Sequence, residues 1–214
     1  MRNETKVKGI VLAVSNVADY DRRLVIMTLE LGKITVFARS VRKPGNPNMA
    51  ACQPFTFASF KLYEGRSAFN LIEANVDNYF MELRKDLDTI SYGLYFCELL
   101  DYFVKEGMED RQLLKLLYIT LTELTHDRLE PRLIRCIYEI KLLALEGIMP
   151  QVKDCGMKTE AAAYAIGFIC ASPVEKVFSF RLEEDALYEL ITFCAEYLGK
   201  NVDRKLKTQD SLPK

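Results

Sequence analysis

The sequence predicts an α+β protein with a five-stranded β-barrel over residues 1–78 and an α-helical domain over residues 79–200. Hydrophobic side chains recur every second residue in the first part and about every 3.6 residues in the second, the periods of strands and of helices. Charge divides the chain in the same way. Residues 1–70 hold eleven Lys or Arg against five Asp or Glu, a net +6, so the remaining residues carry −7 of the total of −1. A basic part joined to an acidic part indicates two kinds of partner, one of them a polyanion.

Three predicted strands begin the barrel. Polar and hydrophobic side chains alternate at the start of residues 5–14 and then become continuously apolar, as in a strand that enters a core. Gly9 within this strand indicates a bulge or a bend. Residues 22–30 form the second strand, and a turn leads into the third at residues 33–39. The inner face of this third strand carries Ile34, Val36 and Ala38, and its outer face carries Lys33, Thr35, Phe37 and Arg39.

The third strand runs into a basic loop. Arg42 and Lys43 precede Pro-Gly-Asn-Pro-Asn at residues 44–48, a composition that cannot continue a strand. Residues 49–52 are a candidate for one helical turn, and a hairpin over residues 55–76 follows. Five short antiparallel strands with a break after the third favour a Greek-key barrel of the oligonucleotide-binding (OB) type, which binds ligands on its central strands and flanking loops.

Beyond residue 79 the hydrophobic period predicts a bundle of three helices and a later amphipathic helix. The expected ranges are 83–104, 113–124, 133–144 and 183–198. Residues 148–180 follow no single pattern and stay unassigned. The polar stretch 201–214 is a tail and a candidate for disorder.

Composition and motifs argue against several classes of protein. No apolar run reaches the roughly 18 residues of a membrane span, and the first residues lack the apolar core of a signal peptide, so we expect a cytoplasmic location. The six cysteines are scattered through the sequence, which favours buried reduced thiols over a disulfide framework. The only histidine, His126, ends a predicted helix and is best explained as a cap. Without a phosphate-binding glycine loop or a catalytic constellation, we expect neither an enzyme nor a cofactor.

Basic residues of the barrel are the candidate ligand-binding side chains. They are Arg22, Arg23, Lys33, Arg39, Arg42 and Lys43. Ordinary solvation would explain most charge runs, but here the excess is confined to one small domain and aromatic residues are interleaved with it. The rings are Tyr20, Phe37, Phe55, Phe57, Phe60, Tyr63 and Phe69. Some of them must fill the core, and the others could stack on nucleic-acid bases.

Two cysteines in the region 147–180 raise the question of a zinc site. A structural zinc ion takes four Cys or His ligands, normally as two Cys-x-x-Cys pairs. Three residues after Cys155 stands Lys158, and three after Cys170 stands Pro173. We therefore expect two adjacent free thiols and no bound metal.

The order and spacing of several motifs resemble the bacterial RecO family of DNA repair and recombination proteins over nearly the full length. The motifs are Gly9-Ile-Val-Leu, Thr28-x-x-x-Gly-Lys-Ile-x-Val-x-Ala-Arg-x-Val-Arg-Lys43, Gln53-Pro-Phe, Gly147-x-x-Pro150 followed by Cys155, and Phe178-x-Phe-x-Leu182. The match is specific as a set, although no single motif would suffice.

This resemblance implies an OB barrel, a helical domain and a non-enzymatic role in the RecF pathway. The family binds single- and double-stranded DNA, anneals complementary strands, and works with RecR and the single-stranded-DNA-binding protein to load recombinase, which implies a place at the nucleoid. Many members carry a four-cysteine zinc module. Here Cys155 and Cys170 match the first cysteine of each pair and are remnants of that module.

The acidic helical part is then the expected partner-binding part. In the family, the tail of the single-strand-binding protein is acidic and ends in apolar residues, so a basic spot beside an apolar groove could hold it. The available basic residues are Lys115, Arg132, Arg135 and Lys141. Solvation of the bundle or pairing with Glu139 and Glu146 explains each of them at least as well.

One alternative function stays open, an OB-fold adaptor that binds other proteins without binding DNA directly. The sequence also leaves open the oligomeric state, the partner surfaces, the relative affinity for single and double strands, and whether zinc is bound despite the two missing cysteines.

Overall fold

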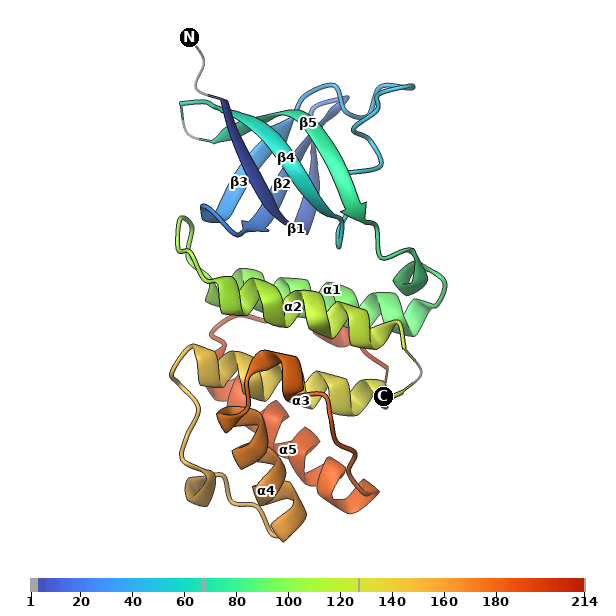
Figure 1. Cartoon of the computed structure of the whole chain (residues 1–214). Coiled ribbons are helices and arrows are strands. Elements are labelled where there is room, and N and C mark those ends of the chain that lie inside the picture. Colours follow the sequence, from blue (N-terminus) through green and yellow to red (C-terminus); the bar gives the residue numbers. More distant parts are fainter. Residues whose placement is uncertain (1–3, 67, 127, 214) are drawn as a thin grey trace.

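The computed structural model describes residues 4–66, 68–126 and 128–213 (Figure 1). A β-barrel lies at one end of the molecule, two helices lie directly beneath it, and the remaining helices form the other end. Among the helices of the described residues, none is long and apolar enough to cross a membrane.

The barrel contains the five strands that the sequence predicts. They are β1 (Glu4–Val17), β2 (Asp21–Thr28), β3 (Gly32–Ala38), β4 (Phe57–Glu64) and β5 (Phe69–Asn78). They close in the order β1-β2-β3-β5-β4, and β4 returns to pair with β1. The closing contact between β3 and β5 is parallel and short, with the pairs Val36–Phe69 and Phe37–Asn70. This order is that of the predicted Greek-key barrel, and its closure leaves few unpaired strand edges.

Burial confirms the face assignment in β3. Gly32, Ile34, Val36 and Ala38 are buried, whereas the residues between them are half-buried. The expected irregularity in β1 lies between Val11 and Ala13, beyond Gly9. Gly9 serves a different purpose, because a Cβ atom there would lie 2.3 Å from the carbonyl oxygen of Met27 on β2.

The connection from β3 to β4 is built from turns. One of them is the single helical turn expected at residues 49–52, because the Cys52 N–H donates to the Asn48 carbonyl at 3.2 Å, the i to i+4 bond of an α-helix. Asn48 anchors this connection to β5, since its side-chain amide donates to the Ile72 carbonyl and its Oδ1 accepts from the Ala74 N–H. These bonds satisfy backbone groups of β5 that have no partner strand on that side. The loop thereby covers the gap where β3 and β5 pair only briefly.

Five α-helices follow, with short 3₁₀ turns between them. The α-helices are α1 (Leu87–Phe103), α2 (Arg111–Leu124), α3 (Pro131–Leu145), α4 (Glu160–Ala171) and α5 (Glu184–Asn201). The 3₁₀ turns span Met81–Arg84, Val152–Asp154, Val174–Lys176 and Gln209–Ser211. The first helix begins four residues later than expected, because Asp86 caps it by accepting from the Thr89 N–H. Helix α4 occupies part of the region that the sequence left unassigned.

One hydrophobic core joins the outer face of the barrel to the helices. Outward-facing side chains of β1 and β2, among them Ile10, Leu12, Val25 and Met27, belong to the same buried cluster as the residues of α1 and α2. A separate cluster fills the barrel interior. Gly32 permits the close approach, since a Cβ atom there would lie 2.1 Å from the Met108 carbonyl oxygen. The helical part thus covers one outer face of the barrel.

The expected disorder of the tail at 201–214 is wrong for residues 202–213, which pack back along α1. Leu206 is only 3% exposed. The Glu98 carboxylate on α1 accepts from the N–H groups of Lys207 and Thr208, and the Tyr102 hydroxyl donates to Asp203. Desolvation opposes the charge of Glu98, but these hydrogen bonds and the one from the Thr208 hydroxyl hold its pKa below its usual value. The sequence does not indicate that Leu206 is buried, because polar residues surround it in the chain.

We expect Leu206→Ala to lower the free energy of unfolding by about 2 kcal/mol, because the substitution leaves a cavity between the tail and α1. Leu87→Ala is the matched control: Leu87 is 78% exposed, and its removal should change stability by less than about 0.5 kcal/mol. Urea denaturation measures both. Equal midpoints for Leu206→Ala and the wild type would show that the tail does not pack on α1.

Candidate nucleic-acid interface

The outer face of β2 and β3 that the helices leave uncovered carries one exposed arginine beside an aromatic ring. Arg23 on β2 lies opposite Phe37 on β3 in the antiparallel register. The Arg23 guanidinium donates to the Thr35 hydroxyl at 3.3 Å, and Phe37 is half-buried on the same face. A cation and a ring surface side by side suit the phosphate and the base of a nucleotide.

The loop after β3 continues this surface at the end of the barrel. Arg39, Arg42 and Lys43 are exposed there. The loop is held against the β1–β2 turn, because the Arg42 N–H donates to the Tyr20 carbonyl and the Lys43 ammonium lies 5.6 Å from the centre of the Tyr20 ring. The Ser40 N–H donates to the Asp21 carboxylate at 2.7 Å. Two loops far apart in the sequence therefore form one basic surface.

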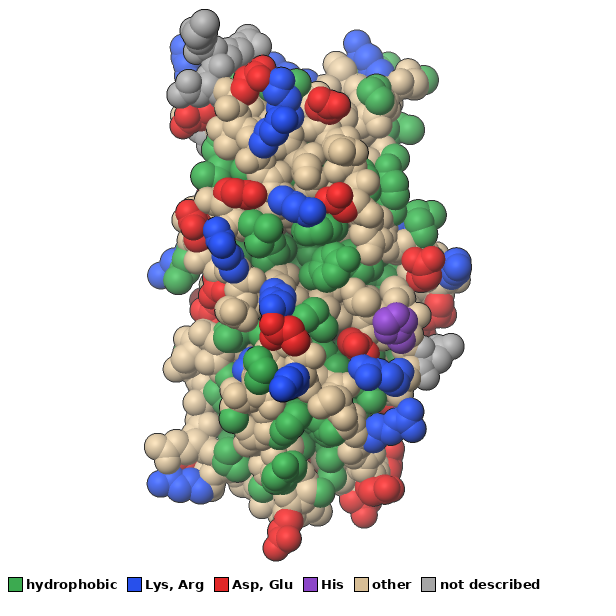
Figure 2. Space-filling view, viewed as in Figure 1, with side chains coloured by type: hydrophobic (Ala, Val, Ile, Leu, Met, Phe, Trp, Pro, Cys, Tyr) green, Lys and Arg blue, Asp and Glu red, His purple; other side chains and the backbone are tan. Residues whose placement is uncertain are grey.

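Arg23, Arg39, Arg42 and Lys43 form no ion pair within the described residues. Arg39 donates to the neutral side chain of Asn70 at 3.3 Å. On the β1–β4–β5 side, by contrast, Lys8 pairs with Asp77 at 3.2 Å and Lys61 with Glu4 at 2.7 Å. Figure 2 shows this second face, where acidic and basic side chains are intermingled. Cations without an ion-pair partner thus gather on β2–β3 and their loops, although Lys6 on β1 and Arg66 after β4 are also exposed without one within the described residues.

Two of the six predicted binding residues are engaged within the protein. The Lys33 ammonium donates to the carbonyl and carboxylate oxygens of Asp101 on α1, at 2.6 and 2.9 Å. Arg22 is half-buried and donates to the Cys52 carbonyl at 2.8 Å. Lys33 therefore joins the barrel to the helices, and Arg22 supports the loop. Neither the Lys33 ammonium nor the Arg22 guanidinium is free to bind a phosphate.

Most of the predicted stacking rings have structural roles. Phe55 and Phe60 are fully buried, Phe57 packs edge-on against Tyr118 of α2, and Phe69 packs against the barrel core. Tyr63 is half-buried on β4. Two rings lie beside the uncompensated cations, Phe37 on β3 and Tyr20, which is 48% exposed. These two are the candidates for base stacking.

The basic residues predicted for partner binding are dispersed over the helices. Lys115 pairs with Glu175, and Arg135 pairs with the buried Glu139 at 2.8 Å, as the sequence allowed. Lys141 is buried and donates to the carbonyls of Cys170 and Ser172 at 3.0 and 2.7 Å. Burial lowers the pKa of Lys141. Lys115 and Lys141 thus connect elements of the bundle, whereas Arg135 and Glu139 pair within α3.

The fourth, Arg132, lies beside a groove lined by four leucines and three charged residues, two of them arginines. The groove holds about 470 Å³ and is lined by Arg128, Leu129, Glu130, Leu133, Arg181, Leu182 and Leu187. The Arg132 guanidinium pairs with Glu130 in its wall and with Glu184 on α5. Sequence reasoning missed Arg128 and Arg181, which come from separate segments and meet because Arg181 donates to the Arg128 carbonyl at 3.0 Å. The available signal was the position of Arg181 inside the motif Phe178-x-Phe-x-Leu182.

The cysteine region does not fit a zinc ion. Among the described residues no group of three or more His, Cys, Asp or Glu side chains is placed to hold a metal. Burial raises the pKa of both the Cys155 and the Cys170 thiol, which favours the protonated form over the thiolate that binds zinc. The Lys141 ammonium instead ties the end of α4 to α3. Packing and this buried lysine hold the two helices together.

We expect the purified protein to hold no stoichiometric zinc, because two thiols leave half of a tetrahedral shell unfilled. Elemental analysis after dialysis is the measurement, with Cys155→Ser/Cys170→Ser as the comparison variant. One zinc ion per chain that disappears in this variant would contradict the expectation.

Comparison with known proteins identifies the same two parts. Residues 1–80 match the family model described as Recombination protein O N terminal, and residues 84–166 match Recombination protein O C terminal. The proteins named DNA repair protein RecO from Clostridium acetobutylicum and Desulforamulus reducens are 25% and 27% identical to this chain. The first alignment covers 97% of this chain and 96% of that relative, and the second covers 96% and 92%. The protein of the same name from Alkaliphilus metalliredigens is 31% identical over 150 residues, which are 70% of this chain and 61% of that relative.

Proposed function

Because this chain belongs to the RecO family of DNA repair and recombination proteins, we propose that it is a DNA-binding recombination mediator of the RecF pathway. In this role it binds single- and double-stranded DNA, anneals complementary strands, and helps to load recombinase onto DNA coated by the single-strand-binding protein. RecR and that single-strand-binding protein are the proposed partners.

The observation that carries this proposal is the group of four unpaired cations on β2, β3 and the following loop. Arg23, Arg39, Arg42 and Lys43 lie beside Phe37 and Tyr20 on one side of a closed barrel. In OB barrels this face and its flanking loops bind oligonucleotides. Cations bind phosphates without sequence preference, and aromatic rings stack on any base. Such a surface therefore suits strand annealing, which must work on DNA of any sequence.

The alternative function is an adaptor that binds only proteins. The salt dependence of DNA binding distinguishes this adaptor from the proposed mediator. Phosphate contacts release counterions, so the affinity for DNA falls steeply as salt rises. Strand annealing on DNA coated by the single-strand-binding protein tests the activity directly. Binding without a steep salt dependence, together with no annealing, would favour the adaptor.

We expect Arg39→Ala/Arg42→Ala/Lys43→Ala to weaken single-strand binding and to flatten the slope of log K against log salt. The change should be about 0.7 per lost phosphate contact, hence up to about 2 for three contacts. Fluorescence anisotropy with a labelled oligonucleotide across a salt series measures both quantities.

The matched control is Lys153→Ala/Lys176→Ala/Lys200→Ala, which removes the same charge from exposed positions of the helical part. It should leave the slope unchanged. Lys33→Met is a second control, expected to reduce stability and to leave DNA affinity at the wild-type value. If the loop variant and the lysine control gave the same slope, the proposed DNA surface would be incorrect.

The basic groove between α3 and α5 supports docking of an acidic partner tail on the helical part. Its leucines offer apolar surface, and Arg181 at the rim forms no ion pair within the described residues. Arg128 pairs with Glu123 at 2.7 Å, and the adjacent Arg132 pairs with Glu130 and Glu184, so an acidic peptide would compete with these carboxylates. Residues 79–214 carry −5, whereas the two arginines and one glutamate that line this groove give it +1. That combination complements a peptide with acidic residues and an apolar end.

We expect Arg132→Gln/Arg181→Gln to weaken binding of a labelled single-strand-binding-protein tail peptide by about tenfold, because rim charges that pair with the acidic tail are lost. Arg111→Gln/Lys115→Gln, with the same change in charge on α2, is the control and should bind as the wild type does. Anisotropy titrations give both dissociation constants, and an equal loss in the two variants would point to nonspecific attraction.

A further inference from the structure

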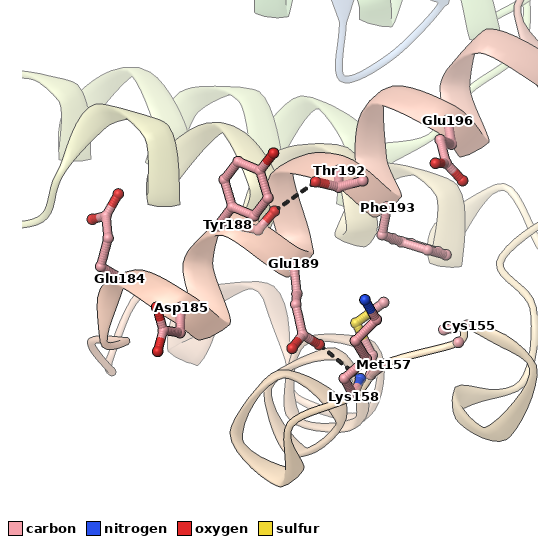
Figure 3. Close-up of a pocket in the computed structure, with 11 residues that line it drawn as sticks. Cys155, Met157, Lys158, Glu184, Asp185, Tyr188, Glu189, Thr192, Phe193 and Glu196 are labelled. Atoms are coloured by element: carbon pink, nitrogen blue, oxygen red, sulfur yellow. Dashed lines mark hydrogen bonds between the residues drawn. The ribbon is translucent and has the colours of Figure 1, made fainter.

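A second groove, of about 700 Å³, lies between α5 and the segment at residues 155–158 (Figure 3). Glu184 lines it and pairs with Arg132, whose other partner Glu130 lines the basic groove. The Arg132–Glu184 ion pair therefore lies between two grooves. In Figure 1 this region is at the end of the molecule away from the barrel.

Apolar side chains form a large part of this second groove. Phe193 is nearly buried and stacks on Tyr197 with ring centres 5.4 Å apart, so its position is fixed. Met157 lies on the opposite wall, and Tyr188 is 67% exposed at the rim. An aromatic side chain this exposed, next to a concave apolar surface, is typical of an interaction site.

The rim is acidic. Four carboxylates line the groove against one cation, Lys158, so its charge is opposite to that of the basic groove. Glu189 is used internally, because its carboxylate accepts from the N–H groups of Lys158 and Thr159 at 2.8 and 3.2 Å and holds the wall in place. Asp185 and Glu196 are exposed and have no hydrogen-bond or ion-pair partner within the described residues.

We propose that this groove binds a basic segment of a partner protein, with Lys or Arg side chains on Asp185 and Glu196 and an apolar side chain between Tyr188 and Phe193. The charge of the groove repels phosphates and acidic peptides, so neither DNA nor an acidic tail is its occupant. Asp185 and Glu196 are eleven residues apart on α5, about 16 Å along the helix axis. A partner helix of about eleven residues or an extended segment of about five spans that length. The proposal goes beyond the mediator function and does not depend on DNA binding.

The test uses the full-length protein and a labelled synthetic helical peptide with Lys on one face and Leu on the other. Asp185→Asn/Glu196→Gln should weaken its binding at least tenfold and reduce the salt dependence. Tyr188→Ala should weaken it about fivefold at unchanged charge, which a purely electrostatic attraction would not produce. Binding of a version of the peptide with Glu in place of Lys should be undetectable.

Glu106→Gln/Glu109→Gln is the matched control, since both residues are exposed on the connection between α1 and α2. It should bind the basic peptide as the wild type does, and all variants should keep the wild-type circular dichroism spectrum and DNA affinity. Equal losses in the control and groove variants would overturn the proposal. So would sedimentation of the wild type as a dimer that Tyr188→Ala dissociates, because the occupant would then be a second copy of the chain. A failure of DNA binding in the wild type would count against the mediator function alone.

Discussion

Burial of one outer face of the barrel against α1 and α2 is the constraint on which the rest of the structure depends. Ile10, Leu12, Val25 and Met27 point away from the barrel interior and are buried with the residues of the first two helices. Exposed together, such side chains would form an apolar patch large enough to drive association. Covering them fixes the barrel on the helices, and it also decides which side chains of β2 and β3 remain available to a ligand.

Polar contacts at the edge of this interface set its geometry. Lys33 donates two hydrogen bonds to Asp101, and the Gly107 N–H donates to the Lys33 carbonyl at 2.9 Å. One turn earlier on the same side of α1, Glu98 holds the C-terminal segment. Hydrophobic burial is not directional, so these hydrogen bonds specify how the barrel is oriented. A basic residue can thus be essential to the architecture while adding nothing to the binding of an anion.

The helical end combines two grooves of opposite charge in a small space. Arg132 pairs with Glu130 and Glu184, and so connects the walls of both. The two proposed segments, one acidic and one basic, would bind at the same end of the molecule on either side of the Arg132–Glu184 ion pair. Together with the basic barrel surface at the far end, this arrangement would let a mediator hold DNA and proteins at once.

Sequence patterns alone predict the five strands of the barrel and four of the five α-helices, all except α4. Alternation in residues 33–39 placed Ile34 and Val36 inside the barrel, and the change of hydrophobic period near residue 79 marked the start of the helices, because these patterns reflect burial of single elements. The sequence could not determine which of several equivalent cations are free. Lys33 and Arg39 look alike in the sequence, yet one meets a carboxylate on α1 and the other reaches only a neutral amide. Likewise, Arg128 and Arg181 line one groove, and Leu206 becomes a buried anchor, only because distant segments meet. The pairing of charges and the shape of a groove depend on contacts between elements, and those contacts exist only in the tertiary structure.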